Sequence, residues 1–160
     1  MQGLRQVERQ PARQEGSAPW ESLAWLLRLL VGCMLIYASA DKILHPQDFA
    51  SIVKDYRLLP EVLLHPVAIW LPWFELLLGV CLYTGFWRHG ALFLATALLG
   101  AFWLALIVNY FRGIDVGCGC FTSTPGEASP MLWYIGRDAL LLTLPLAAWE
   151  AGRRAEAQQA

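Results

Sequence analysis

Two cysteines separated by one glycine, Cys118 and Cys120, are the residues whose type and spacing most favour chemistry in this chain. They stand between two long apolar runs. A structural disulfide usually closes a long loop, whereas a bond across a single residue removes little unfolded-state entropy and stores ring strain. Strained, accessible pairs are typical of labile and catalytic disulfides. The spacing therefore favours redox chemistry, with metal binding and an inert pair as the alternatives.

The composition predicts the environment in which this pair works. Hydrophobic residues make up 57% of the 160 positions and charged residues only 16%, which is too apolar for a soluble domain of this size. Each of four apolar runs is near the roughly 20 residues that cross a bilayer as a helix. Unbroken runs without alternation exclude a β-barrel. We expect an all-α fold, a four-helix transmembrane bundle whose helices cover residues 22–40, 62–83, 91–111 and 131–149.

The remaining segments divide the chain into one membrane domain with two polar ends. Residues 1–20 form a polar leader that we expect to be disordered and cytoplasmic, and residues 151–160 form a short tail that we also expect to be disordered. The membrane domain covers residues 21–150. Within it, the connection 41–61 places apolar residues at helical i, i+3, i+4, i+7 spacing, which predicts a short amphipathic helix at the membrane interface. These residues are Phe49, Ile52, Val53 and Tyr56.

The distribution of basic residues predicts the orientation. With the amino terminus in the cytoplasm, the inner side carries six Arg or Lys residues near helix ends. The outer side carries four, which are Lys42, Lys54, Arg57 and Arg112. This orientation also places Cys118 and Cys120 in an oxidising compartment, where a dithiol can cycle. We expect a multi-pass protein of the cell inner membrane with both termini cytoplasmic and the cysteine loop periplasmic. A net charge of −1 without a basic tract gives no indication of nucleic-acid binding.

Charged residues inside the apolar runs are candidates for pairing or function. Helix rise places Arg28 and Glu75 at about the same depth, so we expect them to form a buried structural ion pair. The alternatives are an Arg28 that reaches the inner interface and a Glu75 that is protonated and merely hydrogen-bonded. Arg137 lies about 9 Å below the outer end of the last run, where its cation could favour a thiolate in the cysteine loop. Its alternative partners are loop carbonyls or Asp115.

The other candidate ligands carry weaker signals. Cys33 and Cys81 lie too far apart along the membrane normal for a disulfide and are expected to fill the core. His45 and His65 project to the same side as Cys118 and Cys120, yet neither has a tight ligand spacing to them. A structural metal site at the cysteine pair therefore stays an alternative, and we predict no metal.

Several segments together resemble the MauE branch of the DoxX-like membrane proteins. The turn Ala38-Ser-Ala-Asp-Lys and the intramembrane Glu75 in Pro72-Trp-Phe-Glu resemble DoxX-like proteins in general. Gly117-Cys-Gly-Cys-Phe, followed by Gly136-Arg-Asp early in the last run, is the more specific MauE pattern. The chain departs from it at Thr122, where a glycine is common.

This resemblance implies a four-helix, redox-associated membrane protein, similar in architecture to the disulfide-generating enzymes of the DsbB and vitamin K epoxide reductase type. It also implies a role in methylamine utilisation, in maturation of the disulfide-rich small subunit of methylamine dehydrogenase. We interpret the chain as a thiol-disulfide oxidoreductase in which Cys118 and Cys120, assisted by Arg137, exchange disulfides with a periplasmic thioredoxin-like protein or a disulfide-containing client. A quinone is the candidate electron acceptor, although the single cysteine pair differs from the two pairs of the DsbB type. The rival hypothesis is a non-enzymatic assembly or transport factor for a periplasmic client.

Overall fold

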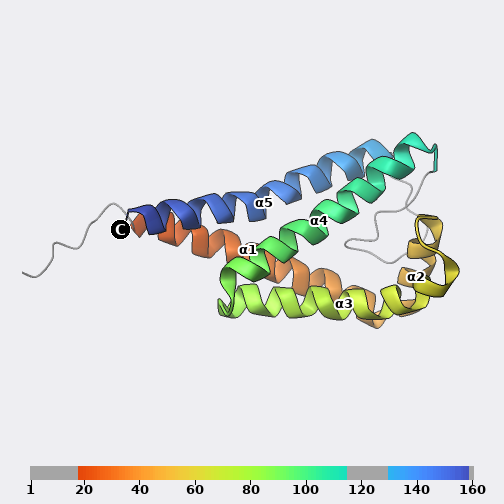
Figure 1. Cartoon of the computed structure of the whole chain (residues 1–160), viewed down its shortest axis with the longest axis horizontal. Helices are drawn as coiled ribbons and strands as arrows, with labels where there is room; N and C mark the ends of the chain where they lie inside the picture. The colour runs from red at the N-terminus through yellow and green to blue at the C-terminus, as the bar shows by residue number, and fades with distance from the viewer. Residues whose placement is uncertain (1–17, 115–129, 159–160) are drawn as a thin grey trace, which may run out of the picture.

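The structure, a computed structural model, describes residues 18–114 and 130–158. These residues form five helices and no strand, so the predicted all-α fold class is confirmed. Four helices are long and the second is short (Figure 1). The helices are α1 (Ala18–Leu44), α2 (Pro46–Asp55), α3 (Glu61–Thr84), α4 (Arg88–Phe111) and α5 (Met131–Ala157).

The four long helices each have the length and composition of a membrane span. They contain 24 to 27 residues, which corresponds to about 36–40 Å of helix and exceeds the roughly 30 Å of a hydrocarbon core. Large apolar side chains cover their outward faces, among them Trp70, Phe93 and Leu140. Exposed apolar surface of this extent suits lipid rather than water.

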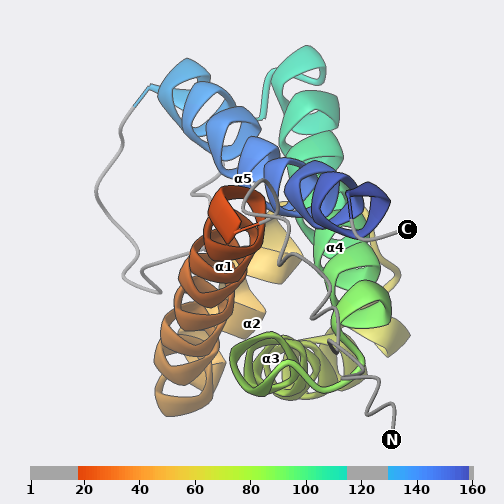
Figure 2. The same cartoon turned by 90° about the vertical axis from the view of Figure 1, so that its left-hand side faces the viewer.

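The long helices run up and down and close into a ring. In the order α1, α3, α4, α5, each helix packs against the next, and α5 packs back against α1 (Figure 2). We call the end that holds Leu44, Glu61, Phe111 and Met131 the α2 end of the bundle. The other end, which holds the start of α1, the α3–α4 turn and the end of α5, is the turn end.

Two glycines bring α1 and α3 into close contact. A β-carbon placed on Gly32 would lie 3.0 Å from the Gly79 carbonyl oxygen, and one on Gly79 would lie 2.8 Å from a side-chain carbon of Ile36. Small residues allow membrane helices to approach this closely. The contact falls in the middle of α1 but only five residues before the end of α3, so the two helices are offset along their axes.

The buried apolar residues form one cluster toward each end. The cluster nearer the turn end joins all four long helices and includes Val31, Leu82 and Ala95. The cluster at the α2 end joins α2, α4 and α5 through Ile52, Leu106 and Met131, together with Tyr56. The amphipathic helix predicted in the connection 41–61 is therefore present, and its apolar face packs on the bundle.

Two expected boundaries were wrong. The first span was expected to end at residue 40, but α1 continues to Leu44. The tail 151–160 was expected to be disordered, but α5 continues to Ala157. Ala, Glu and Arg favour a helix there, and Glu156 accepts a hydrogen bond from Arg88 at 2.8 Å, which ties the end of α5 to the start of α4.

Candidate functional site

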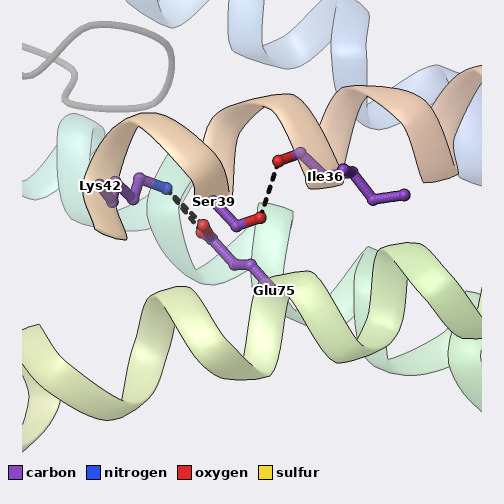
Figure 3. Close-up of polar contacts among 4 residues, drawn as sticks. All are labelled: Ile36, Ser39, Lys42 and Glu75. Carbon is purple, nitrogen blue, oxygen red and sulfur yellow. Dashed lines mark hydrogen bonds and ion pairs between the residues drawn. The ribbon is translucent and has the colours of Figure 1, made fainter. Parts of the chain in front are cut away.

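A buried ion pair between α1 and α3 is the centre of the candidate site (Figure 3). The Lys42 ammonium donates to both carboxylate oxygens of Glu75, at 2.7 Å and 2.6 Å. Each residue is only 2% exposed. Ionisable side chains at this depth in a membrane protein are costly and are retained for pairing or function.

Aromatic rings from two further helices surround the Lys42 ammonium. Its nitrogen lies 5.2 Å from the ring centroid of Phe49 on α2 and 5.3 Å from that of Phe102 on α4. A cation held over ring faces in a desolvated place is attracted by about 2 kcal/mol. Lys42 thus connects its own helix with α2, α3 and α4, and Glu75 supplies the compensating charge.

A second charged pair lies beside the first. Asp138 on α5 is 7% exposed and lines a small cavity that Lys42 and Glu75 also line. Its Oδ1 atom accepts a hydrogen bond from Arg137 Nε at 2.9 Å and forms an ion pair with Arg137 Nη2 at 2.8 Å. The cavity has about 20 Å³, enough for one water, which needs at least roughly 10–15 Å³ and polar partners. We call these two ion pairs, which share the cavity through Lys42, Glu75 and Asp138, the charge network.

Helix geometry explains why Lys42 reaches Glu75. Side chains lean toward the amino end of their own helix, and α1 and α3 are antiparallel. Lys42 lies ten residues beyond the glycine contact on α1, whereas Glu75 lies four residues from it on α3, which leaves about 9 Å of rise between their backbones. Because Lys42 leans toward the turn end and Glu75 toward the α2 end, the two side chains close this gap.

The predicted pairing of Arg28 with Glu75 was therefore wrong. Arg28 and Glu75 each precede the glycine of their own helix by four residues, and in antiparallel helices these displacements add to about 12 Å. Arg28 lies instead against Gly85 in the α3–α4 turn, where a β-carbon on the glycine would be 3.3 Å from its Nη2 atom. The expectation used the ends of the apolar runs to set depth, and these do not reveal the axial offset of α1 and α3.

The sequence contained a signal for Lys42 that the prediction missed, because Lys42 was counted among the charges outside the membrane. The buried face of α1 runs through Val31, Leu35, Ala38 and Lys42, at the helical spacing of i, i+4, i+7 and i+11. Extending this periodicity beyond residue 40 places Lys42 inside the bundle.

The predicted redox residues Cys118 and Cys120 lie outside the described residues. The segment that carries them follows Ile114, three residues after the end of α4, and precedes Pro130, the residue before α5, both at the α2 end. Arg137, six residues into α5, is near this entry and also packs its guanidinium 5.3 Å from the ring centroid of Tyr134.

The other cysteines and the candidate metal ligands are apart from the network. Cys81 is partly buried, as a core filler would be, but Cys33 is exposed on α1 and does not fill the core. Both are free thiols. His45 faces the carbonyl oxygen of Asp41 at 3.2 Å. Within residues 18–114 and 130–158, no three His, Cys, Asp or Glu side chains are grouped as metal ligands.

Comparison with known proteins shows which family this chain resembles. A family profile described as methylamine utilisation protein MauE matches residues 20–150. The chain is 32% identical over 120 residues to the methylamine utilization protein MauE of Paracoccus denitrificans, covering 74% of this chain and 63% of that relative. It is 34% identical over 115 residues to the protein of the same name in Methylorubrum extorquens, covering 71% and 61%. The chain thus spans less than two thirds of these relatives. No solved structure matches.

Four apolar spans closed around a buried charge network define a multi-pass membrane protein. The profile match covers most of the spans, from residue 20 in α1 to residue 150 in α5. The chain belongs to the MauE family.

Proposed function

We propose that this protein is a membrane thiol-disulfide exchange protein that acts through Cys118 and Cys120. The observation that carries the proposal is the position of the Cys-Gly-Cys segment in the sequence: it joins α4 to α5 at the α2 end, the half of the bundle that holds the Lys42–Glu75 pair. A dithiol with one intervening residue favours a labile disulfide. The names of the relatives support a role in methylamine utilisation, within which maturation of the disulfide-rich methylamine dehydrogenase is the proposed task.

The exchange reaction needs no group beyond the two cysteines and a partner. One thiolate attacks a sulfur of the partner disulfide, forms a mixed disulfide and releases the other partner sulfur as a thiolate. The second cysteine then attacks the mixed disulfide, so that this protein holds the new Cys118–Cys120 disulfide and the partner leaves as a dithiol with the electron pair. The reverse sequence oxidises the partner. A thioredoxin-like periplasmic protein or a disulfide-containing client is the proposed partner.

Arg137 is the proposed positioning residue of this reaction. It stands near the entry of α5, and a cation close to a thiol favours the thiolate. Asp138 holds the guanidinium through a hydrogen bond of 2.9 Å and an ion-pair contact of 2.8 Å.

A quinone fits the apolar cavity between α2, α3 and α4. This cavity has about 280 Å³ and is lined by apolar side chains, among them Phe49, Phe102 and Leu71, with Tyr56 as its polar-tipped member. When bound, a quinone would accept the electron pair from a reduced dithiol. Phe49 and Phe102, which would line the site of the quinone, also contact the Lys42 ammonium.

Thiol labelling in intact cells tests the proposed chemistry and orientation together. In a variant with Cys33→Ser and Cys81→Ser, only the pair can react. We expect a membrane-impermeant maleimide to add twice after mild reduction and not at all before it, because the cysteines are outside and joined at rest. Addition of two labels only after lysis would refute the proposed periplasmic position. Equal labelling before and after reduction, even with oxidant present, would show that the two thiols do not form a disulfide. This result would favour the rival hypothesis of a non-enzymatic assembly factor.

A further inference from the structure

A cavity at the turn end, opposite the charge network, contains a cation, Arg28, for which the described residues supply no ion-pair partner. It lies between α1, α4 and α5 and has about 300 Å³, at the lower end of ligand pockets. Arg28, Arg88 and His89 supply its basic groups, and Trp25 and Trp149 supply aromatic walls. Tryptophan is typical of the interface between lipid and water. Figure 2 views the bundle from this end.

Arg28 is the unexplained group of this cavity. Its Nε atom is buried and has no hydrogen-bond partner within residues 18–114 and 130–158. Among the residues that the structure describes, no carboxylate forms an ion pair with its guanidinium, although Glu21 and Glu156 line the same cavity. Glu156 is engaged by Arg88 at 2.8 Å and by His89 at 3.2 Å. A buried donor without a partner costs about 1–3 kcal/mol, and more when it is charged.

The local backbone adds positive charge on the same side. Arg88 and His89 are the first residues of α4, and Trp87, which precedes them, makes no side-chain hydrogen bond that would cap the helix. The first N–H groups of a helix and its dipole favour an anion. The start of α4 therefore adds partial positive charge beside the Arg28 guanidinium, and the one carboxylate that pairs with its first residues in the described structure, Glu156, does not pair with Arg28.

We propose that this cavity binds a phosphate group, with Arg28 as its main ligand. A guanidinium presents a planar fork that matches phosphate oxygens, and helix amino ends bind phosphate through backbone N–H groups. The tryptophans place the cavity at the level of lipid head groups, so an anionic phospholipid is one source of the phosphate and a soluble phosphate anion is the other. Basic pockets between membrane helices are typical sites for such head groups.

Thermal unfolding of the purified full-length protein tests this proposal. The protein is delipidated in a neutral, phosphate-free detergent and receives phosphatidylglycerol, phosphatidylcholine or inorganic phosphate. We expect phosphatidylglycerol to raise the midpoint and phosphatidylcholine to do so much less. For Arg28→Gln, the concentration that gives half of this gain should rise about tenfold or more, because a charged hydrogen bond is lost. A gain with inorganic phosphate alone, lost in the same variant, identifies the soluble anion as the source.

Arg153→Gln is the matched control. It removes the same charge at the same end of the bundle, from a side chain that is 67% exposed and does not line the cavity. This variant should keep the full increase in unfolding midpoint with phosphatidylglycerol. Arg28→Lys, which keeps the charge but loses the fork, should show an intermediate gain.

The sign of the effect without anion separates a binding role from a structural one. An unpaired, partly buried cation is a cost to the free protein, so Arg28→Gln should unfold at the same temperature as the wild type or higher in the absence of anion. Loss of stability or of folding in this variant under all conditions would overturn the proposal, since Arg28 would then support the α3–α4 turn. If Arg153→Gln lost as much of the phosphatidylglycerol-induced rise in midpoint as Arg28→Gln, the proposal would be overturned as well. Any surface cation would then be enough to bind the lipid.

Discussion

The Lys42–Glu75 pair predicts a large energetic coupling between α1 and α3. Removing Lys42 by Lys42→Met leaves the Glu75 carboxylate buried without a partner, which costs about 3–5 kcal/mol. Loss of the two ring contacts of the ammonium adds about 1–2 kcal/mol. Glu75→Gln leaves the ammonium buried and should cost about 3–5 kcal/mol. Both substitutions keep the side-chain volume, so cavities contribute little.

The double variant removes both charges. Its loss in free energy of unfolding should be much smaller than the sum of the losses of the two single variants. A neutral Met beside a neutral Gln leaves no buried charge, so we expect a coupling of about 2–4 kcal/mol. Ordinary interhelical hydrogen bonds in membranes couple by only about 0.6 kcal/mol, so the two cases are distinguishable. The measurement is the free energy of unfolding in mixed micelles with a denaturing detergent, followed by circular dichroism.

An exposed pair on α5 provides the control for this cycle. Arg153 and Glu150 lie 3.5 Å apart with side chains 67% and 57% exposed. Solvent screens such a pair, and its coupling should stay at or below about 0.5 kcal/mol. Additive losses at Lys42 and Glu75, with a coupling no larger than that of the control, would refute the conclusion that the buried pair fastens the bundle.

Two further predictions concern helix packing. Gly79→Val should destabilise the protein by at least about 1–3 kcal/mol, because the β-carbon alone would lie 2.9 Å from the Gly32 carbonyl oxygen. Gly100→Ala is the control, since no atom lies within 4 Å of a β-carbon there, and it should be neutral or stabilising in the same unfolding assay. Comparable losses at both positions would contradict the close contact of α1 and α3. Trp103→Phe should cost about 1 kcal/mol, because the indole Nε1 donates to the Ile135 carbonyl oxygen at 3.1 Å and joins α4 to α5; an unchanged midpoint would show that this hydrogen bond contributes nothing.

Much of the fold could be predicted from the sequence because each span is long and apolar throughout. Hydropathy alone decides that the run ending at Phe111 is a helix across the membrane, and the i, i+3, i+4, i+7 spacing around Phe49 predicts α2. The ends of the helices were harder. Lys42 and the tail after residue 150 are polar by type, and their partners in the fold, Glu75 and Arg88, lie far away in the sequence.

The candidate site could be predicted only in part. Glu75 was predicted to be a buried charge because it lies deep inside an apolar run, and the structure confirms its burial. Its partner depends on the axial offset between α1 and α3, which the Gly32–Gly79 contact sets and which no property of a single helix reveals. Cys118, Cys120 and their relation to Arg137 stay predictions.

The most direct test of thiol exchange is the capture of a mixed disulfide by single-cysteine variants. Of Cys118→Ser and Cys120→Ser, the variant that keeps the attacking cysteine should accumulate a reducible adduct with a periplasmic thiol protein, because it lacks the residue that resolves the bond. Cys33→Ser and Cys81→Ser should show no adduct and keep function. The account predicts that the double variant Cys118→Ser, Cys120→Ser fails to support maturation of a disulfide-containing client; full maturation in that variant, with no adduct from either single variant, would contradict it.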